Sequence, residues 1–148
     1  KLEQLRMIEN LAREYPISYI EDPFMEDDFV SFSMLTRSLP RKLIVGDDLY
    51  ATNLKRLKDG IEIKATNSMI VKPSQVGTIS DMIKVVELAK ENKIVTVMSH
   101  RSGETEDSLI AHLAVGLGCE YVKFGISGER IAKLNEMLRI EETIKNLP

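Results

Sequence analysis

Short runs of apolar, often β-branched residues alternate along this chain with longer segments in which apolar residues recur at helical spacing. This alternation is typical of β-strand and α-helix units repeated around a parallel sheet. Each run is too short and too continuously apolar for an exposed antiparallel strand. The five predicted strands span residues 17–20, 42–45, 68–71, 94–98 and 121–123. The sequence therefore predicts an α/β fold with parallel strands.

Helices are expected between these strands. One opens the chain over residues 1–14, and a short one starts near Asn53 and ends at Gly60, because glycine commonly terminates a helix. After the third strand, Thr78 is placed to cap a helix through its hydroxyl. We assign to the core the apolar stripes of the last three helices: Ile79, Met82, Ile83, Val86 and Ala89; Leu109, Ile110, Leu113, Ala114 and Leu117; and Ile131, Leu134 and Leu138.

The length and composition fit one globular domain. The chain has 148 residues, of which 43% are hydrophobic and 29% charged, and no linker-like segment divides it. We therefore predict a single domain over residues 1–148. The alternation begins with a helix rather than a strand, so further units are expected upstream of Lys1.

The charge pattern limits the class of partner. A net charge of −3, spread along the whole sequence, offers no basic stripe for nucleic acid or for an anionic membrane. No apolar run approaches the roughly 20 residues that a membrane span needs. The first residues carry no secretory segment, so a cytoplasmic protein that binds small molecules is expected.

Charged or polar side chains stand at or just beyond the C-terminal end of each predicted strand. These residues are Glu21, Asp47, Lys72, His100 and Lys123, and neighbours lie 23 to 28 residues apart. Parallel strands would bring all five to the same end of the sheet, where α/β proteins place their chemistry. One charged residue after a strand usually marks only the return of the chain to solvent, but five in register indicate a site.

The residue types suggest a cation and a base. Glu21 and Asp47 offer hard oxygen ligands of the kind that Mg²⁺ prefers, and neither His nor Cys joins them as zinc would require. Lys72 would lie close to that cation. Nearby positive charge and burial favour a neutral amine, which can then accept a proton as a general base, and Lys123 could supply a second positive charge.

The segment Ser99-His100-Arg101-Ser102-Gly103 adds a candidate anion site. It places a guanidinium and two hydroxyls at a strand-to-helix turn, which suits a phosphate or a carboxylate. The alternative for this segment alone is an ordinary surface loop in which Arg101 forms a solvent-exposed ion pair.

Five motifs in this order and spacing resemble the enolase family over nearly the whole chain. They are YIEDPF at 19–24, VGDDL at 45–49 followed by Thr52-Asn53, KPSQ at 72–75, SHRSGETED at 99–107 and ERIAKLN at 129–135. The resemblance implies the last five βα units of a TIM-type (β/α)8 barrel, which is incomplete in this chain because the first barrel strands and a separate N-terminal domain are absent.

The resemblance also implies a reaction and a cofactor. Enolases are lyases of glycolysis that use Mg²⁺ to dehydrate 2-phosphoglycerate reversibly to phosphoenolpyruvate. At the matching positions, Glu21 and Asp47 are two of three ligands of the tightly bound Mg²⁺, and Lys72 removes the proton from carbon 2 of the substrate. Active sites of the enolase superfamily are an established example of a Lys or His base that works beside one or two Mg²⁺ ions.

Further residues are implied to bind or act on the substrate. Arg101 contacts the phosphate, Lys123 the substrate carboxylate, and His100 lies near the leaving hydroxyl, while Ser102 lies near a second metal ion. The implied catalytic residues are Lys72, Lys123 and His100, and the implied substrate-binding residues are Glu21, Asp47, Ser99, His100, Arg101, Ser102 and Lys123. Acidic neighbours are expected to orient these groups or cap turns: Asp22, Asp48, Glu104, Glu106 and Asp107.

The implied absence of a third metal ligand and of a general acid predicts little activity for the chain by itself. Open sheet edges at the first and last strands predict self-association or marginal stability, and the intact enzyme is expected to be a homo-oligomer.

Two other interpretations remain open. A flavodoxin-like receiver domain could use Asp47-Asp48 as its acidic pair, but it needs a phospho-accepting aspartate where Lys72 stands and leaves residues 99–107 unexplained. A noncatalytic role, with weak phosphate binding through Arg101, is the third interpretation.

Overall fold

The computed structural model describes residues 1–147, which divide into two compact units. The first unit is Lys1–Thr96 and the second begins at Val97, so the division falls within a strand. The prediction that residues 1–148 form one domain stays a prediction.

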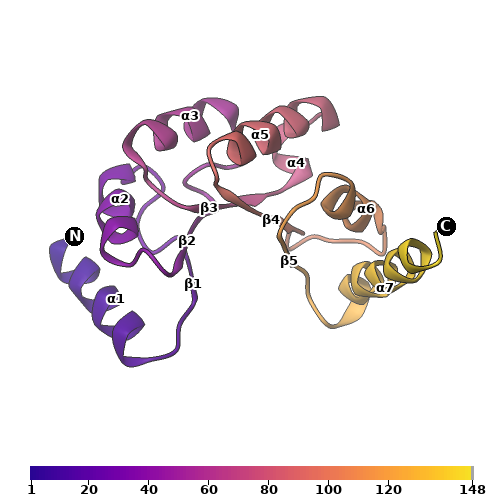
Figure 1. Ribbon diagram of the computed structural model, residues 1–148, viewed down its shortest axis with the longest axis horizontal. Coiled ribbons are helices and arrows are strands. Elements are labelled where there is room, and N and C mark those ends of the chain that lie inside the picture. The colour runs from indigo at the N-terminus through magenta and orange to yellow at the C-terminus, as the bar shows by residue number, and fades with distance from the viewer. Residues whose placement is uncertain (148) are drawn as a thin grey trace. The chain divides into compact units, whose positions relative to one another are not determined.

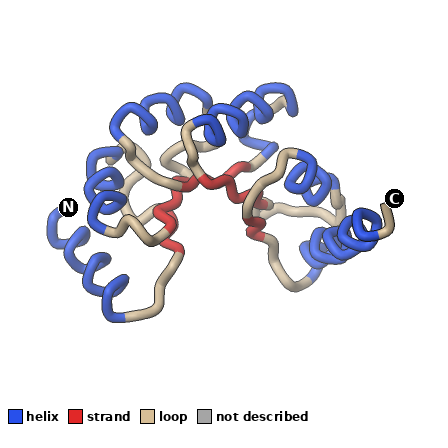
Figure 2. Tube along the Cα trace, in the orientation of Figure 1, coloured by secondary structure: helices blue, strands red, loops and turns tan. Residues whose placement is uncertain are grey.

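The first unit alternates helices with short strands (Figure 1). Its elements are α1 (Leu2–Glu14), β1 (Tyr19–Glu21), α2 (Phe29–Ser38), β2 (Leu43–Gly46), α3 (Leu54–Ile63), β3 (Ser68–Val71), α4 (Pro73–Val76) and α5 (Ile79–Glu91). Helix α1 packs against α2, α2 against α3, and α3 against α5. These helices form a layer on one side of the strands, as the blue and red segments of Figure 2 show.

The strands of this unit pair in parallel. Glu21 of β1 pairs with Val45 of β2, and Gly46 of β2 pairs with Met69 of β3. Strands β2 and β3 are largely buried, with Ile44, Val45, Met69, Ile70 and Val71 all without solvent exposure, whereas β1 is half-buried. Because the strands run in the same direction, the residues that end β1 and follow β2 lie at the same edge of the sheet.

The turn after β2 is anchored by Tyr50, which is fully buried and hydrogen-bonds Thr66 through its hydroxyl at 2.8 Å. Its ring needs glycine on two sides. A Cβ at Gly46 would lie 2.7 Å from the ring, and one at Gly60 would lie 2.5 Å from it. Gly60 is therefore required for close packing inside α3, and the prediction that it ends this helix is wrong.

The second unit contains the end of β4 (Val95–Ser99), α6 (Leu109–Gly116), β5 (Tyr121–Lys123), the 3-10 turn η1 (Gly128–Arg130) and α7 (Ile131–Lys145). Strands β4 and β5 pair in parallel, with Ser99 opposite Lys123. Helix α6 packs against α7. The carboxyl ends of the two strands therefore meet at Ser99 and Lys123.

The prediction of five parallel strands alternating with helices is confirmed. Two predicted strands coincide with the observed ones, and three are displaced by one or two residues toward the C-terminus. The predicted cap is also confirmed, since the hydroxyl of Thr78 accepts a hydrogen bond from the Asp81 amide at 3.1 Å. No helix among residues 1–147 is both long and apolar enough to cross a membrane.

Part of the predicted helical core is wrong. Ile79, Leu109 and Ile131 are exposed by 48%, 51% and 40%. Each is the first residue of its helix, where a side chain tilts back toward the N-terminus and so projects past the helix end. Leu138 is also exposed, and within the described part of α7 the structure buries only Lys133.

Candidate active site

Two carboxylates lie at the carboxyl ends of β1 and β2. Glu21 is the last residue of β1, and Asp47 follows β2 directly. Asp47 is 8% exposed, whereas Glu21 is half-buried. The hydroxyl of Tyr19 donates a hydrogen bond to Oε2 of Glu21 at 2.8 Å, and burial raises the pKa of Tyr19, so this hydroxyl keeps its proton as a donor.

Asp22 orients the turn that carries Asp47. Its Oδ1 accepts a hydrogen bond from the Asp47 amide at 2.9 Å, and its Oδ2 accepts one from the Asp48 amide at 2.7 Å. The backbone of Asp22 is left-handed, with φ of 41°, which is uncommon outside glycine. These contacts give Asp22 the orienting role expected from the sequence.

Lys72 points to this edge from the end of β3. Its Nζ lies 2.5 Å from Oδ2 of Asp47 and donates a hydrogen bond to it. The side chains of Lys72 and Asp47 are only 15% and 11% exposed, so solvent screens this ion pair weakly. The structure thus brings together Glu21, Asp47 and Lys72 of the predicted site.

Burial dominates the electrostatics of this group. It raises the pKa of Asp47, against the opposing effect of the Lys72 ammonium, and the charges of Glu21 and Asp22 raise it further. Burial also raises the pKa of Asp22, although its two amide donors act in the opposite direction. The single positive charge of Lys72 does not balance the negative charges of Glu21, Asp22 and Asp47. This excess of negative charge favours a bound cation.

The donor set fits Mg²⁺. Oδ1 of Asp47 is buried and has no hydrogen-bond partner among the residues that the structure describes. A carboxylate oxygen in that position is a hard ligand suited to Mg²⁺. No three His, Cys, Asp or Glu side chains within residues 1–147 are grouped closely enough to form a complete metal site. Glu21 and Asp47 could therefore supply part of a coordination shell.

The second unit carries the other predicted site residues. Ser99 ends β4 and is 2% exposed, and its hydroxyl donates to the carbonyl of His100 at 3.0 Å. Arg101 and Ser102 follow in an exposed loop, and Lys123 is exposed at the end of β5. The loop therefore presents a guanidinium and a hydroxyl to solvent.

His100 is held in one orientation. Its Nδ1 accepts a hydrogen bond from the Gly125 amide at 3.3 Å, and its ring stacks on Phe124 with a centroid separation of 6.5 Å. Burial lowers the pKa of His100, and the charge of Arg130 lowers it further. With Nδ1 as acceptor, the neutral ring carries its proton on Nε2.

Two cations from the ERIAKLN segment hold this loop, and the sequence alone predicted no role for either. Arg130 donates through Nη2 to the carbonyl of Ser102 at 3.2 Å. Lys133 has no solvent exposure, donates to the carbonyl of Thr105 and lies 3.6 Å from Oε1 of Glu104. Two basic residues three apart at the start of a helix were the only sequence signal for these contacts.

The predicted residues thus fall into two groups. The first unit holds Glu21, Asp47 and Lys72, and the second holds Ser99, His100, Arg101, Ser102 and Lys123. That both groups act on one substrate stays a prediction.

Parallel βα units with carboxylates and a lysine at the strand ends define an α/β protein whose candidate site lies at the carboxyl ends of its strands. The family model described as "Enolase, C-terminal TIM barrel domain" matches residues 2–147. The chain belongs to the enolase family, a family of glycolytic lyases, and the resemblance found in the sequence is confirmed. This membership is at odds with the receiver-domain alternative.

Individual relatives agree with the family match. The chain is 52% identical over 141 residues to an enolase of Natronomonas pharaonis, covering 94% of this chain and 35% of the relative. It is 51% identical over 146 residues to an enolase of Methanosphaera stadtmanae, covering 97% and 35%. For an enolase of Ureaplasma parvum the identity is 47% over 146 residues, covering 97% and 33%. The chain thus spans about a third of the length of these relatives.

Proposed function

We propose that this chain is the C-terminal barrel part of an enolase and takes part in the Mg²⁺-dependent dehydration of 2-phosphoglycerate to phosphoenolpyruvate. Family membership supports this proposal. The observation that carries it is the contact of 2.5 Å between Nζ of Lys72 and Oδ2 of Asp47. It places a lysine beside a carboxylate of the metal-binding type, which is the combination of a Lys base and a Mg²⁺ site that such proton abstraction uses.

Lys72 acts as the base. The Lys72 ammonium, which pairs with Asp47 in the chain, must first give up a proton. The neutral amine then accepts the proton from carbon 2 and becomes an ammonium again. The electron pair of the broken C–H bond then forms the carbon 2–carbon 3 double bond. The hydroxyl of carbon 3 leaves as water with a proton from a general acid.

Glu21 and Asp47 are the residues that would hold Mg²⁺. The bound ion would supply positive charge beside the substrate carboxylate, which makes the adjacent carbon a stronger acid. Within the chain, Asp22 fixes the amide of Asp47 and Tyr19 fixes the carboxylate of Glu21. These contacts restrict both candidate ligands before any ion binds.

The second group binds the substrate's charged ends. Arg101 is proposed to contact the phosphate, because a guanidinium can donate two parallel hydrogen bonds to it. Ser99 and Ser102 supply hydroxyls, Lys123 pairs with the carboxylate, and His100 offers its Nε2 proton near the leaving hydroxyl. The anchoring of this loop through Ser102 and Thr105 supports a binding role.

Several finer predictions belong to the same proposal. They are a cytoplasmic location, a homo-oligomeric intact enzyme, and little activity of the chain by itself. Without activity, weak phosphate binding through Arg101 would be the remaining function.

A hybrid enzyme tests the proposal. The chain would replace the matching 146-residue segment of the Methanosphaera stadtmanae enolase, to which it is 51% identical. We expect the hybrid to form phosphoenolpyruvate from 2-phosphoglycerate with Mg²⁺ and to lose this activity in a chelator, while the chain alone forms none. A hybrid that folds like the unreplaced enzyme and forms no product would contradict the proposal.

A further inference from the structure

Thr52 has a backbone conformation that its side chain disfavours. Its φ is 51°, and that of its neighbour Ala51 is 44°. A β-branched residue rarely adopts this left-handed region, because its side chain crowds the backbone there. Such a conformation persists only where surrounding contacts hold it, and these positions are often functional. Thr52 is also 1% exposed, so its hydroxyl must find partners inside the protein.

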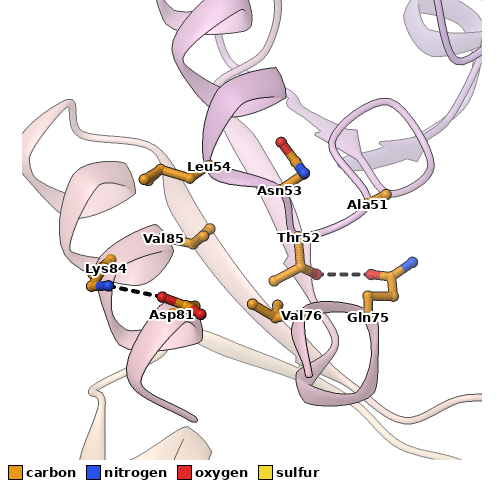
Figure 3. A pocket seen from close by; sticks show the side chains of 9 residues that line it. All are labelled: Ala51, Thr52, Asn53, Leu54, Gln75, Val76, Asp81, Lys84 and Val85. Carbon is orange, nitrogen blue, oxygen red and sulfur yellow. Dashed lines mark hydrogen bonds and ion pairs between the residues drawn. The ribbon is translucent and has the colours of Figure 1, made fainter. Parts of the chain in front are cut away.

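The hydroxyl of Thr52 joins two turns. It accepts a hydrogen bond from the backbone amide of Lys72 at 2.9 Å and donates one to Oε1 of Gln75 at 2.8 Å. Figure 3 shows the second of these bonds, with the neighbouring side chains of Thr52 and Gln75 pointing toward each other. The turn after β2 is thereby tied to the turn after β3, through a group that valine could not replace.

On its C-terminal side, the backbone at Lys72 is held by a further hydrogen bond, which the Gln75 amide donates to the Lys72 carbonyl at 3.0 Å. Lys72 precedes α4, a four-residue helix with no buried residue and no side-chain cap. A cavity of about 300 Å³, lined in part by Thr52, Gln75 and Val76, lies beside this turn. The two hydrogen bonds of Thr52 therefore help to fix a turn that borders open space rather than the core.

The same turn holds the partner of Lys72. The carbonyl of Asp47 accepts hydrogen bonds from the amides of Tyr50 and Ala51 at 3.1 and 2.8 Å, which closes the turn from Asp47 to Thr52. One end of this turn carries the carboxylate that binds Nζ of Lys72, and the other end binds its amide. The segment from Asp47 to Thr52 therefore binds both the backbone amide and the side-chain Nζ of Lys72.

We propose that Thr52 is a positioning residue that sets the placement of the base Lys72 through the hydrogen bond to its amide. This inference rests on the proposed function, since it concerns the reaction that Lys72 performs. The strained backbone at residues 51 and 52 is what aims the hydroxyl at that amide.

Exchange of the carbon 2 proton of 2-phosphoglycerate with solvent tests this inference in the hybrid enolase. Thr52→Val keeps the shape and removes the hydroxyl, and Thr52→Ala removes it and also relieves the β-branched strain. We expect exchange to slow by about 10- to 100-fold in both variants, as a misplaced catalytic group would cause. The KM should stay within about twofold, because substrate contacts are unchanged. Thr52→Ser restores the hydroxyl and should recover most of the rate.

A matched control is Thr36→Val, which removes a threonine hydroxyl that donates to the carbonyl of Ala65 at 2.7 Å, away from Lys72. It should leave exchange unchanged. Amide hydrogen exchange in the chain itself gives a second readout, and the Lys72 amide should lose protection in Thr52→Ala but not in Thr36→Val.

The outcomes separate the two proposals. Exchange at the normal rate in Thr52→Ala, or a raised KM with unchanged turnover, would overturn the positioning role. A Lys72 amide that stays protected in Thr52→Ala would overturn it as well. If instead the unsubstituted hybrid failed to exchange the carbon 2 proton, the proposed function would fall, whatever the protection of the Lys72 amide.

Discussion

Nζ of Lys72 binds one oxygen of the Asp47 carboxylate at 2.5 Å, while the other oxygen is buried without a partner among the described residues. The two oxygens are thus in different states. Oδ2 accepts a hydrogen bond from the lysine, and Oδ1 keeps its lone pairs available to a hard cation. A single carboxylate can in this way hold the base and contribute to the metal site.

Removing the lysine should destabilise the chain. Lys72→Met leaves the buried Asp47 carboxylate beside Glu21 and Asp22 without its compensating charge. We expect the free energy of unfolding in urea to fall by about 1.5–3 kcal/mol, the range for hydrogen bonds to charged groups. Adding Asp47→Asn should recover much of this loss, because the uncompensated charge is gone.

The exposed ion pair of Lys84 and Asp81, at 2.8 Å, provides the control. Lys84→Met should change the stability little, because solvent screens this pair. Equal losses for Lys72→Met and Lys84→Met would contradict the account of a buried pair.

Mg²⁺ should act on the same carboxylates. We expect it to raise the midpoint of thermal unfolding more in Lys72→Met than in the unsubstituted chain, because the ion can replace the missing ammonium and stabilises the state that binds it. Sodium chloride at matched ionic strength controls for screening. Equal shifts in both chains, or no shift beyond that of the sodium control, would argue against an ion at Asp47.

His100 should make stability depend on pH. Burial lowers its pKa below the ordinary value of 6.5, so the folded chain binds this proton less readily than the unfolded chain. The free energy of unfolding should therefore fall as the pH drops below 6.5, until the folded-state pKa is passed. His100→Gln should lose less stability between pH 7 and 5, measured by urea unfolding at each pH. A His100 titration midpoint at or above that of the urea-unfolded chain, measured by NMR, would refute this.

Lys133 should control the mobility of the loop after β4. Lys133→Met removes its bonds to Thr105 and Glu104, so amide hydrogen exchange at residues 102–107 should quicken by about 10- to 100-fold, from the usual energy of a charged hydrogen bond. Lys145→Met, which loses an exposed contact of 2.5 Å to Glu141, is the control and should leave the loop unchanged. A loop that exchanges equally slowly in both variants would show that Lys133 does not anchor it.

The strands could be predicted because continuous apolar runs mark buried parallel strands, but their ends could not. Glu21 and Ser99 are polar, yet each pairs within the sheet as the last residue of its strand. The apolar run stops before the last hydrogen-bonded residue of the strand, so the predicted strands end too early. The interpretation of Gly60 as a helix end failed for a related reason, since only the fold shows that Tyr50 needs the space.

The charged residues of the candidate site could be predicted from their position after the strands. The residues that hold them in place could not be predicted. The role of a hydroxyl or a basic side chain depends on which distant backbone group the fold brings within hydrogen-bond distance. Thr52 and Lys133 lay within motifs that were recognised, yet nothing in the sequence pairs Thr52 with the Lys72 amide or Lys133 with the Thr105 carbonyl. These contacts join positions 20 and 28 residues apart.

Exchange of the carbon 2 proton of 2-phosphoglycerate in the Lys72→Ala hybrid enolase tests the central claim most directly. The account predicts that the unsubstituted hybrid exchanges this proton with solvent, that Lys72→Ala abolishes the exchange, and that calorimetric titration still shows Mg²⁺ binding. Exchange that continues in a folded, Mg²⁺-binding Lys72→Ala hybrid would contradict it, because the proton would then go to another base.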